Sequence, residues 1–142
     1  MSTANNQELV QQFVEQFWNQ GRLDSADTLL TADAAIYLPG HGQVDMATLK
    51  LFAATMRGAF PDWHSTVEAM LAQGDQVVER FTGRGTHRGV FQGVAPTGRV
   101  VAVPGVVFYR LSAGRIAEFR GLLDSLSLLQ QIGALPMAAE AA

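Results

Sequence analysis

The sequence contains no cysteine, which excludes disulfide bonds, thiol nucleophiles and cysteine-ligated metal sites. No apolar run approaches the ~20 residues needed to span a membrane, and residues 1–8 are too polar for a signal peptide. The net charge is −3 and the basic residues are scattered, so the basic surface typical of nucleic-acid binding is missing. We therefore predict a cytoplasmic protein that binds neither nucleic acid nor a membrane.

The composition is that of a globular protein, with 48% hydrophobic and 16% charged residues. A length of 142 residues suits one domain with a substantial core and is too short for two ordinary domains. We predict a single domain over residues 1–142, with loose termini at residues 1–5 and 137–142. The histidines His41, His64 and His87 are too irregularly spaced to indicate a metal site.

Three β-strands are predicted in the second half of the chain, at residues 76–85, 99–111 and 116–123. The first two segments are rich in the β-branched and aromatic residues that favour strands. The last two are joined by a short hairpin loop, residues 112–115, whose glycine permits a positive φ. An antiparallel ribbon of this length must bury one face, so the preceding chain is expected to cover it.

The first half of the chain is mainly helical by its apolar spacing, i, i+3, i+4. Helices are predicted at residues 9–18, ended by Gly21, and at residues 23–30. A third, capped by Asp45, covers residues 45–60 with Leu49, Phe52 and Met56 directed inward. Short strands at 35–38 and 64–71 and a last helix at 125–132 complete the set. This order predicts an α+β fold with helices packed on one antiparallel sheet.

Five segments carry a resemblance to a known family: Phe60-Pro-Asp-Trp-His64, Gly85-Thr-His-Arg-Gly89, Gly93-Val-Ala-Pro-Thr-Gly98, Gly114-Arg-Ile-Ala-Glu118 and Asp124-Ser-Leu-Ser-Leu-Leu-Gln-Gln-Ile-Gly133. In this order they resemble the SnoaL-like polyketide (ester) cyclases of the nuclear transport factor 2-like superfamily. The resemblance implies a cone-shaped curved antiparallel sheet closed by three N-terminal helices, with a short C-terminal helix. It also implies a small hydrophobic ligand inside the cone and a homodimer formed through the outer face of the sheet.

The named members of that family close a ring by an intramolecular aldol reaction without a metal or an organic cofactor, so the resemblance implies no cofactor here. An acidic residue on the last strand acts as acid/base, and a histidine can assist it. Asp124 is the candidate carboxylate and His87 the candidate helper. Each has a structural alternative: Asp124 can cap the following helix, and His87 can fix its turn through hydrogen bonds.

The last strand departs from the family pattern. Where relatives often carry Trp and Asp, this sequence has Arg120 and Gly121. Arg120 can anchor an anionic ligand or form an ion pair with Asp124 or Glu118. Glu79 and Arg80 lie on opposite faces of one strand, so one of the two is expected to point into the cone.

We predict that seven residues line the ligand pocket: Phe17, Tyr37, His41, Trp63, Phe108, Phe119 and Arg120. The first hypothesis for function is a cofactor-independent acid/base enzyme that acts on a hydrophobic carbonyl compound, as a polyketide cyclase does. The alternative is a non-catalytic protein, either a small-ligand-binding or a dimeric accessory domain. An ionisable side chain deep in the cavity favours the enzyme, and an entirely apolar cavity favours the alternative.

Overall fold

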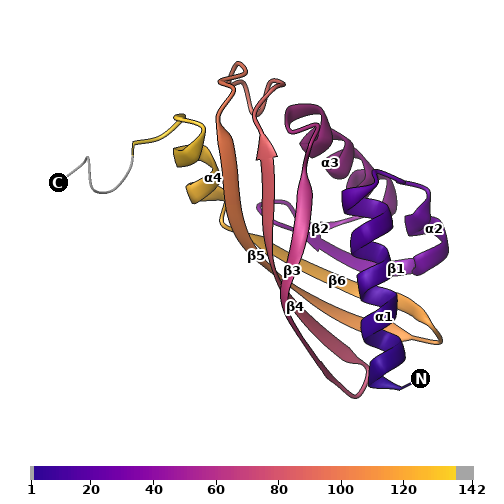
Figure 1. Cartoon of the computed structure of the whole chain (residues 1–142). Coiled ribbons are helices and arrows are strands. Elements are labelled where there is room, and N and C mark those ends of the chain that lie inside the picture. Colours follow the sequence, from indigo (N-terminus) through magenta and orange to yellow (C-terminus); the bar gives the residue numbers. More distant parts are fainter. Residues whose placement is uncertain (1, 137–142) are drawn as a thin grey trace.

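One six-stranded sheet organises the molecule, with the strand order β2-β1-β6-β5-β4-β3 (Figure 1). The structure is a computed structural model that describes residues 2–136. Its strands are β1 (Leu30–Leu38), β2 (Gly42–Val44), β3 (His64–Gln73), β4 (Gln76–Thr86), β5 (Val100–Ser112) and β6 (Arg115–Leu123). Its helices are α1 (Thr3–Phe13), continued by the π-helical turn η1 (Val14–Asn19), α2 (Ser25–Leu29), α3 (Met46–Ala59) and α4 (Ser125–Gln131). The predicted α+β class is confirmed.

Strand β5 alternates almost strictly between buried and exposed residues, which fits a strand with one face on a core. The β5–β6 hairpin turns at Ala113 and Gly114, both with positive φ (51° and 78°). Two consecutive positive φ angles suit a tight hairpin, and glycine adopts one of them without strain. The predicted ribbon is therefore confirmed, with bounds that shift by at most one residue.

The sheet is mixed rather than purely antiparallel, because β1 pairs in parallel with β6. The sequence predicted only residues 35–38 of β1. The register between β1 and β6 shifts between Leu30 and Ala35, and this irregular stretch interrupts the alternation that reveals a strand. The N-terminus also differs from prediction: Ser2 caps α1 through a hydrogen bond from the Asn5 amide, so residues 3–5 are helical. Residues 137–142 lie outside the described part of the chain.

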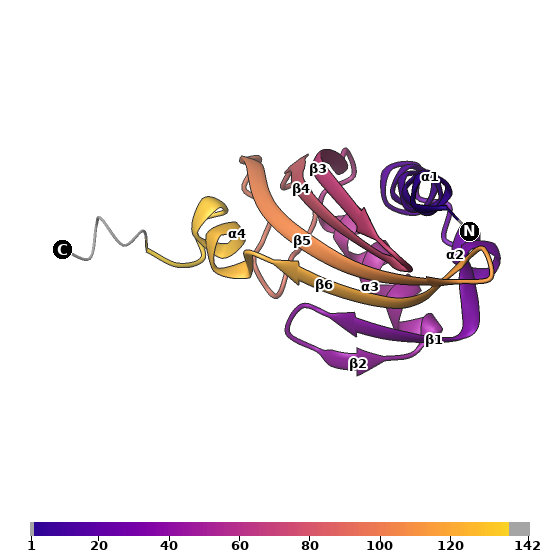
Figure 2. The ribbon, with the colours of Figure 1, turned by 90° about the horizontal axis from the view of Figure 1, so that it is seen from below.

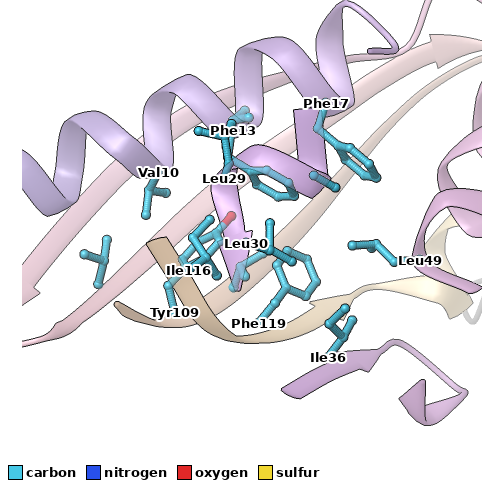
Figure 3. Packing of buried hydrophobic residues seen from close by; sticks show 14 of the residues in the cluster. Val10, Phe13, Phe17, Leu29, Leu30, Ile36, Leu49, Tyr109, Ile116 and Phe119 are labelled. Atoms are coloured by element: carbon cyan, nitrogen blue, oxygen red, sulfur yellow. The ribbon is translucent and has the colours of Figure 1, made fainter. Parts of the chain in front are cut away.

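The strands bend strongly, so that β1 and β2 lie apart from β3 and β4 across the curve (Figure 2). The helices pack on the concave face, where Phe13 and Phe17 project from α1 and η1 toward Tyr109 and Phe119 (Figure 3). Leu49 reaches this core from α3, whose first turn Asp45 caps by accepting a hydrogen bond from the Thr48 amide, as predicted. The convex face of β3 to β6 carries no helix among the described residues.

Candidate functional site

A cavity opens on the concave face between α3 and the middle of the sheet. It has an empty volume of about 550 Å³, including its open mouth, and we name it the inner chamber. Its lining is mostly apolar and comes from η1, α3 and five strand regions: Trp18, Leu38, Pro39, Phe52, Met56, Trp63, Ser65, Glu79, Phe81, Val107, Phe119, Gly121, Leu122 and Leu123. An apolar pocket with few polar groups is typical of a small-molecule site.

Glu79 supplies the only carboxyl group of this lining. Its side chain is buried, and its Oε1 accepts a hydrogen bond of 2.8 Å from the hydroxyl group of Tyr109. Burial raises the pKa of Glu79 to about 7, and the Tyr109 bond opposes the rise. Among the described residues, none donates a hydrogen bond to the other oxygen, Oε2. Glu79 lines the cavity and can therefore exchange a proton near neutral pH through an oxygen that no described residue occupies.

The raised pKa of Glu79 predicts that the protein is less stable at pH 8 than at pH 5. The folded state binds the proton more tightly than the unfolded chain, so this stabilisation is complete below pH 4.5 and is lost as the pH rises through 7. We expect the wild-type free energy of unfolding to fall by roughly 3 kcal/mol more than that of Glu79→Gln over this range. Urea denaturation at each pH measures the difference.

The exposed Glu118 provides the matched control for that measurement. Its hydrogen bond with Arg120 lowers the pKa of its carboxyl, so Glu118 remains charged throughout the pH range used. Glu118→Gln should therefore leave the change between pH 5 and pH 8 as in the wild type. A wild-type protein and a Glu79→Gln variant with the same pH dependence would contradict the raised pKa.

Glu79 shares one cross-strand row with Gly121. The register pairs Glu79 of β4 with Val107 of β5, and Val107 with Gly121 of β6. The two outer members of the row are about 10 Å apart, because neighbouring strands are spaced about 4.8 Å. Gly121 of β6 is the position where the family pattern predicts an acid. The carboxylate of this cavity thus lies in the same cross-strand row as that position, but two strands away on β4.

A second, wider cavity adjoins the inner chamber and has an empty volume of about 870 Å³, including open solvent. Leu38, Pro39, Phe52, Met56 and Leu123 border both cavities. The polar part of the second lining consists of His41, Thr48, Thr55, Gln92 and Ser125. We name this space the outer chamber. Phe52 and Met56 of α3 border both chambers and form part of the wall between them.

Asp124 is exposed at the end of β6 and borders neither chamber. Its Oδ1 accepts a hydrogen bond of 3.0 Å from the Ser127 amide, which makes it the N-cap of α4. The capping alternative recognised from the sequence is therefore confirmed.

His87 is completely buried and also borders neither chamber. Its Nδ1 accepts a hydrogen bond of 3.2 Å from the Thr97 amide and lies 2.9 Å from the Thr97 hydroxyl, while its ring packs against Phe60. Its backbone is bonded to Arg99 and Gly98. These contacts hold the β4–β5 connection closed, which is the structural alternative considered for His87.

The seven predicted pocket residues divide into two groups. Trp63 and Phe119 line the inner chamber and His41 lines the outer chamber. The other four require correction. Phe17, on η1, is buried in the hydrophobic core. Neither Phe17 nor Tyr37 borders a chamber.

Phe108 and Arg120 lie on the convex face, because they alternate with the inward residues Val107, Tyr109 and Phe119. The Arg120 guanidinium is 3.8 Å from the centre of the Tyr37 ring and pairs with Glu118. The ion-pair alternative for Arg120 is therefore confirmed, with Glu118 as the partner.

A curved sheet closed by helices over an apolar chamber defines a small-molecule pocket protein of the α+β class. The sequence profile of the SnoaL-like polyketide cyclases matches residues 8–132, and the chain belongs to this family. The family predicted from the sequence is thus confirmed. A comparison with curated proteins found no significant match.

Solved structures agree with this assignment. A protein from Jannaschia sp. CCS1, provisionally described as a SnoaL-like polyketide cyclase, is 28% identical (94% of this chain and 95% of that chain covered, TM-score 0.85). IdmH from Streptomyces antibioticus, provisionally described as a polyketide cyclase, is 30% identical (90% and 98%, TM-score 0.82). AclR from Streptomyces galilaeus is 30% identical (95% and 100%, TM-score 0.87) but is provisionally described as a hydroxylase. The shared fold therefore hosts more than one described activity.

Within residues 2–136, no cluster of three or more His, Asp or Glu side chains is arranged to hold a metal ion. In the same range, no helix is both long and apolar enough to cross a membrane.

Proposed function

We propose that this protein is an acid/base enzyme that acts on a hydrophobic carbonyl compound by cyclase-like, aldol-type chemistry. The observation that carries the proposal is the carboxyl group of Glu79, buried in an apolar chamber with its pKa raised to about 7. A buried ionisable group is the feature that distinguishes the enzyme hypothesis from a non-catalytic pocket. Membership of the SnoaL-like family supports a small-molecule substrate.

Glu79 is the proposed general acid/base. As the carboxylate, its Oε2 removes a proton from the carbon next to a carbonyl group, which leaves an enolate and protonated Glu79. The enolate carbon then attacks a second carbonyl carbon of the same substrate, and a carbon–carbon bond forms while that carbonyl oxygen gains the electron pair. Glu79 returns the proton to the resulting alkoxide. Atoms and charges balance without a further reactant.

Tyr109 holds the proposed base in place. Its hydroxyl group donates to Oε1 of Glu79, and its ring packs edge-on against Phe13 and Phe119. Burial and the neighbouring carboxylate raise the pKa of Tyr109 well above its usual value, so Tyr109 remains a hydrogen-bond donor. A fixed donor on Oε1 leaves Oε2 as the oxygen that can meet a substrate.

Proton exchange at the α-carbon of 1-tetralone, a bicyclic aromatic ketone, tests the proposal without the natural substrate. The protein is incubated with the ketone in D₂O and loss of the α-proton signal is followed by NMR. Exchange above the buffer rate that depends on Glu79 is the expected result. Binding of the ketone with no enhanced exchange would favour the non-catalytic alternative.

We also propose that the protein forms a homodimer through the convex face of its sheet. Leu71 (75%) and Phe108 (48%) are large apolar side chains exposed there. The register brings Leu71, Val78 and Phe108 into one row across β3, β4 and β5. Arg110 and Arg120 flank the patch together with Glu118, so both charge signs are present, as suits a surface that faces a second copy of itself.

Light scattering should therefore give twice the 15.3 kDa mass of one chain at micromolar concentration. Phe108→Asp should give the monomer, because a charge would be placed in the centre of the apolar patch. Leu51→Asp, at a leucine on α3 that is even more exposed (66%), is the control and should remain dimeric. A monomeric wild type, or a dimeric Phe108→Asp variant, would contradict this interface.

A further inference from the structure

We propose that the hydroxyl group of Ser65 is a second polar contact for the substrate and selects a molecule with an oxygen at each end. This inference rests on the proposed function, since it takes the inner chamber as the substrate site. Ser65 is buried on β3 and lines the chamber at the end remote from Tyr109. It belongs to the few polar side chains in an otherwise apolar wall.

The hydrogen bonds of Ser65 leave its donor free. Its Oγ accepts a hydrogen bond of 3.1 Å from Nε1 of Trp63, so the indole satisfies the oxygen as an acceptor. In residues 2–136, no side-chain or backbone oxygen accepts a hydrogen bond from this hydroxyl. A hydroxyl carries one donor in addition to its acceptor sites. The O–H group of Ser65 is therefore free to donate a hydrogen bond to a molecule in the inner chamber.

Asn19 fixes the backbone of Ser65. Strand β3 is at the edge of the sheet, and the Asn19 side chain occupies the place of a missing neighbouring strand there. Its Oδ1 accepts from the Ser65 amide at 2.7 Å, and its Nδ2 donates to the Ser65 carbonyl at 3.1 Å. The same Nδ2 also bonds to Glu15. Because Asn19 ends the π-helical turn η1, this irregular turn aligns a side-chain amide with the strand edge.

Gly83 fixes the position of the Trp63 ring. A Cβ atom at residue 83 would lie 2.1 Å from Cζ2 of Trp63, so only glycine leaves room for the indole to lie against β4. Ser65 pairs directly with Gly83 in the sheet. The indole that lies on Gly83 therefore donates its N–H to the hydroxyl oxygen of Ser65. This bond holds the Ser65 hydroxyl group in place before a substrate arrives.

The register gives the separation of the two polar groups. Glu79 lies four residues from Gly83 along β4, which corresponds to about 13 Å at 3.3 Å per residue. Phe81 lies between them and lines the same chamber. A molecule that meets both groups must be elongated and apolar in the middle. These features describe an elongated molecule with an oxygen substituent at each end.

Two commercial probes test this inference: 2,6-dihydroxyanthraquinone, with a hydroxyl at both ends, and 2-hydroxyanthraquinone, with one. Their dissociation constants are measured by quenching of tryptophan fluorescence. We expect the wild type to bind the dihydroxy probe about 10-fold more tightly, the effect of one additional hydrogen bond. Ser65→Ala should remove this preference, and Ser65→Thr, which retains a hydroxyl, should keep it.

Thr66→Ala is the matched control, because Thr66 is the adjacent hydroxyl residue of β3 and is absent from the lining of the chamber. It should keep the preference, whereas Asn19→Ala should reduce it, since Asn19 positions Ser65. A wild type without the preference, or Ser65→Ala with the full preference, would overturn the inference and leave Ser65 as only the acceptor for Trp63. The proposed function fails separately, if Glu79→Gln retains full 1-tetralone exchange while the probe preference still depends on Ser65.

Discussion

Glu79→Gln should reduce the protein-dependent exchange of 1-tetralone by about 100-fold to 10,000-fold, the usual contribution of a general acid/base. Glutamine has nearly the shape of glutamate and can still accept the Tyr109 hydrogen bond, but it cannot remove a proton. The wild-type rate should rise with pH and level off above the raised pKa of Glu79, about 7. NMR rates measured from pH 5 to pH 9 give both results.

Asp124→Asn is the matched control for this experiment. Asparagine caps a helix about as well as aspartate, so the variant should keep the stability of α4. Its exchange rate should equal that of the wild type, because Asp124 is exposed and borders neither chamber. An inactive Asp124→Asn variant together with an active Glu79→Gln variant would return the base to the end of β6, where the family resemblance places an acid.

Periodic patterns accounted for most of the fold. The alternation of β5 and the helical spacing in α3 are local signals, and each element has the predicted type. The parallel pairing of β1 with β6 joins segments about 80 residues apart, and no local pattern specifies such a contact. The π-helical turn at 14–19 was also missed, because its apolar residues continue the spacing of α1 and predict an ordinary helix.

The site was less predictable than the fold. Strand alternation alone placed one of Glu79 and Arg80 inside the cone, and the structure shows that it is Glu79. Choosing Glu79 over Arg80 required the register between β4 and β5, which brings the Tyr109 hydroxyl to the Glu79 carboxyl, and the sequence does not specify that register. Phe108 and Arg120 were predicted to line the pocket from their residue types. The strand alternation that buries Tyr109 and Phe119 instead turns Phe108 and Arg120 outward.

The largest loss of stability is expected from Phe13→Ala. Phe13 is completely buried, stacks on Phe17 with ring centroids 4.9 Å apart, and meets Tyr109 and Phe119 edge-on at 6.5 and 6.1 Å. Removing the ring leaves a cavity between α1 and the sheet that neighbouring strands cannot fill, so we expect a loss of about 3–5 kcal/mol. Chemical denaturation monitored by circular dichroism measures the change.

Phe52→Ala is the comparison that tests this interpretation. Phe52 is only half-buried and borders both chambers, so its removal widens an existing space instead of creating an enclosed one. Its loss should be about 1–1.5 kcal/mol, in proportion to the smaller area that the ring buries. The variant should instead bind 1-tetralone more weakly, because the wall between the chambers is lost. If the two substitutions destabilised the protein equally, Phe52 would belong to the core rather than to the wall of the site.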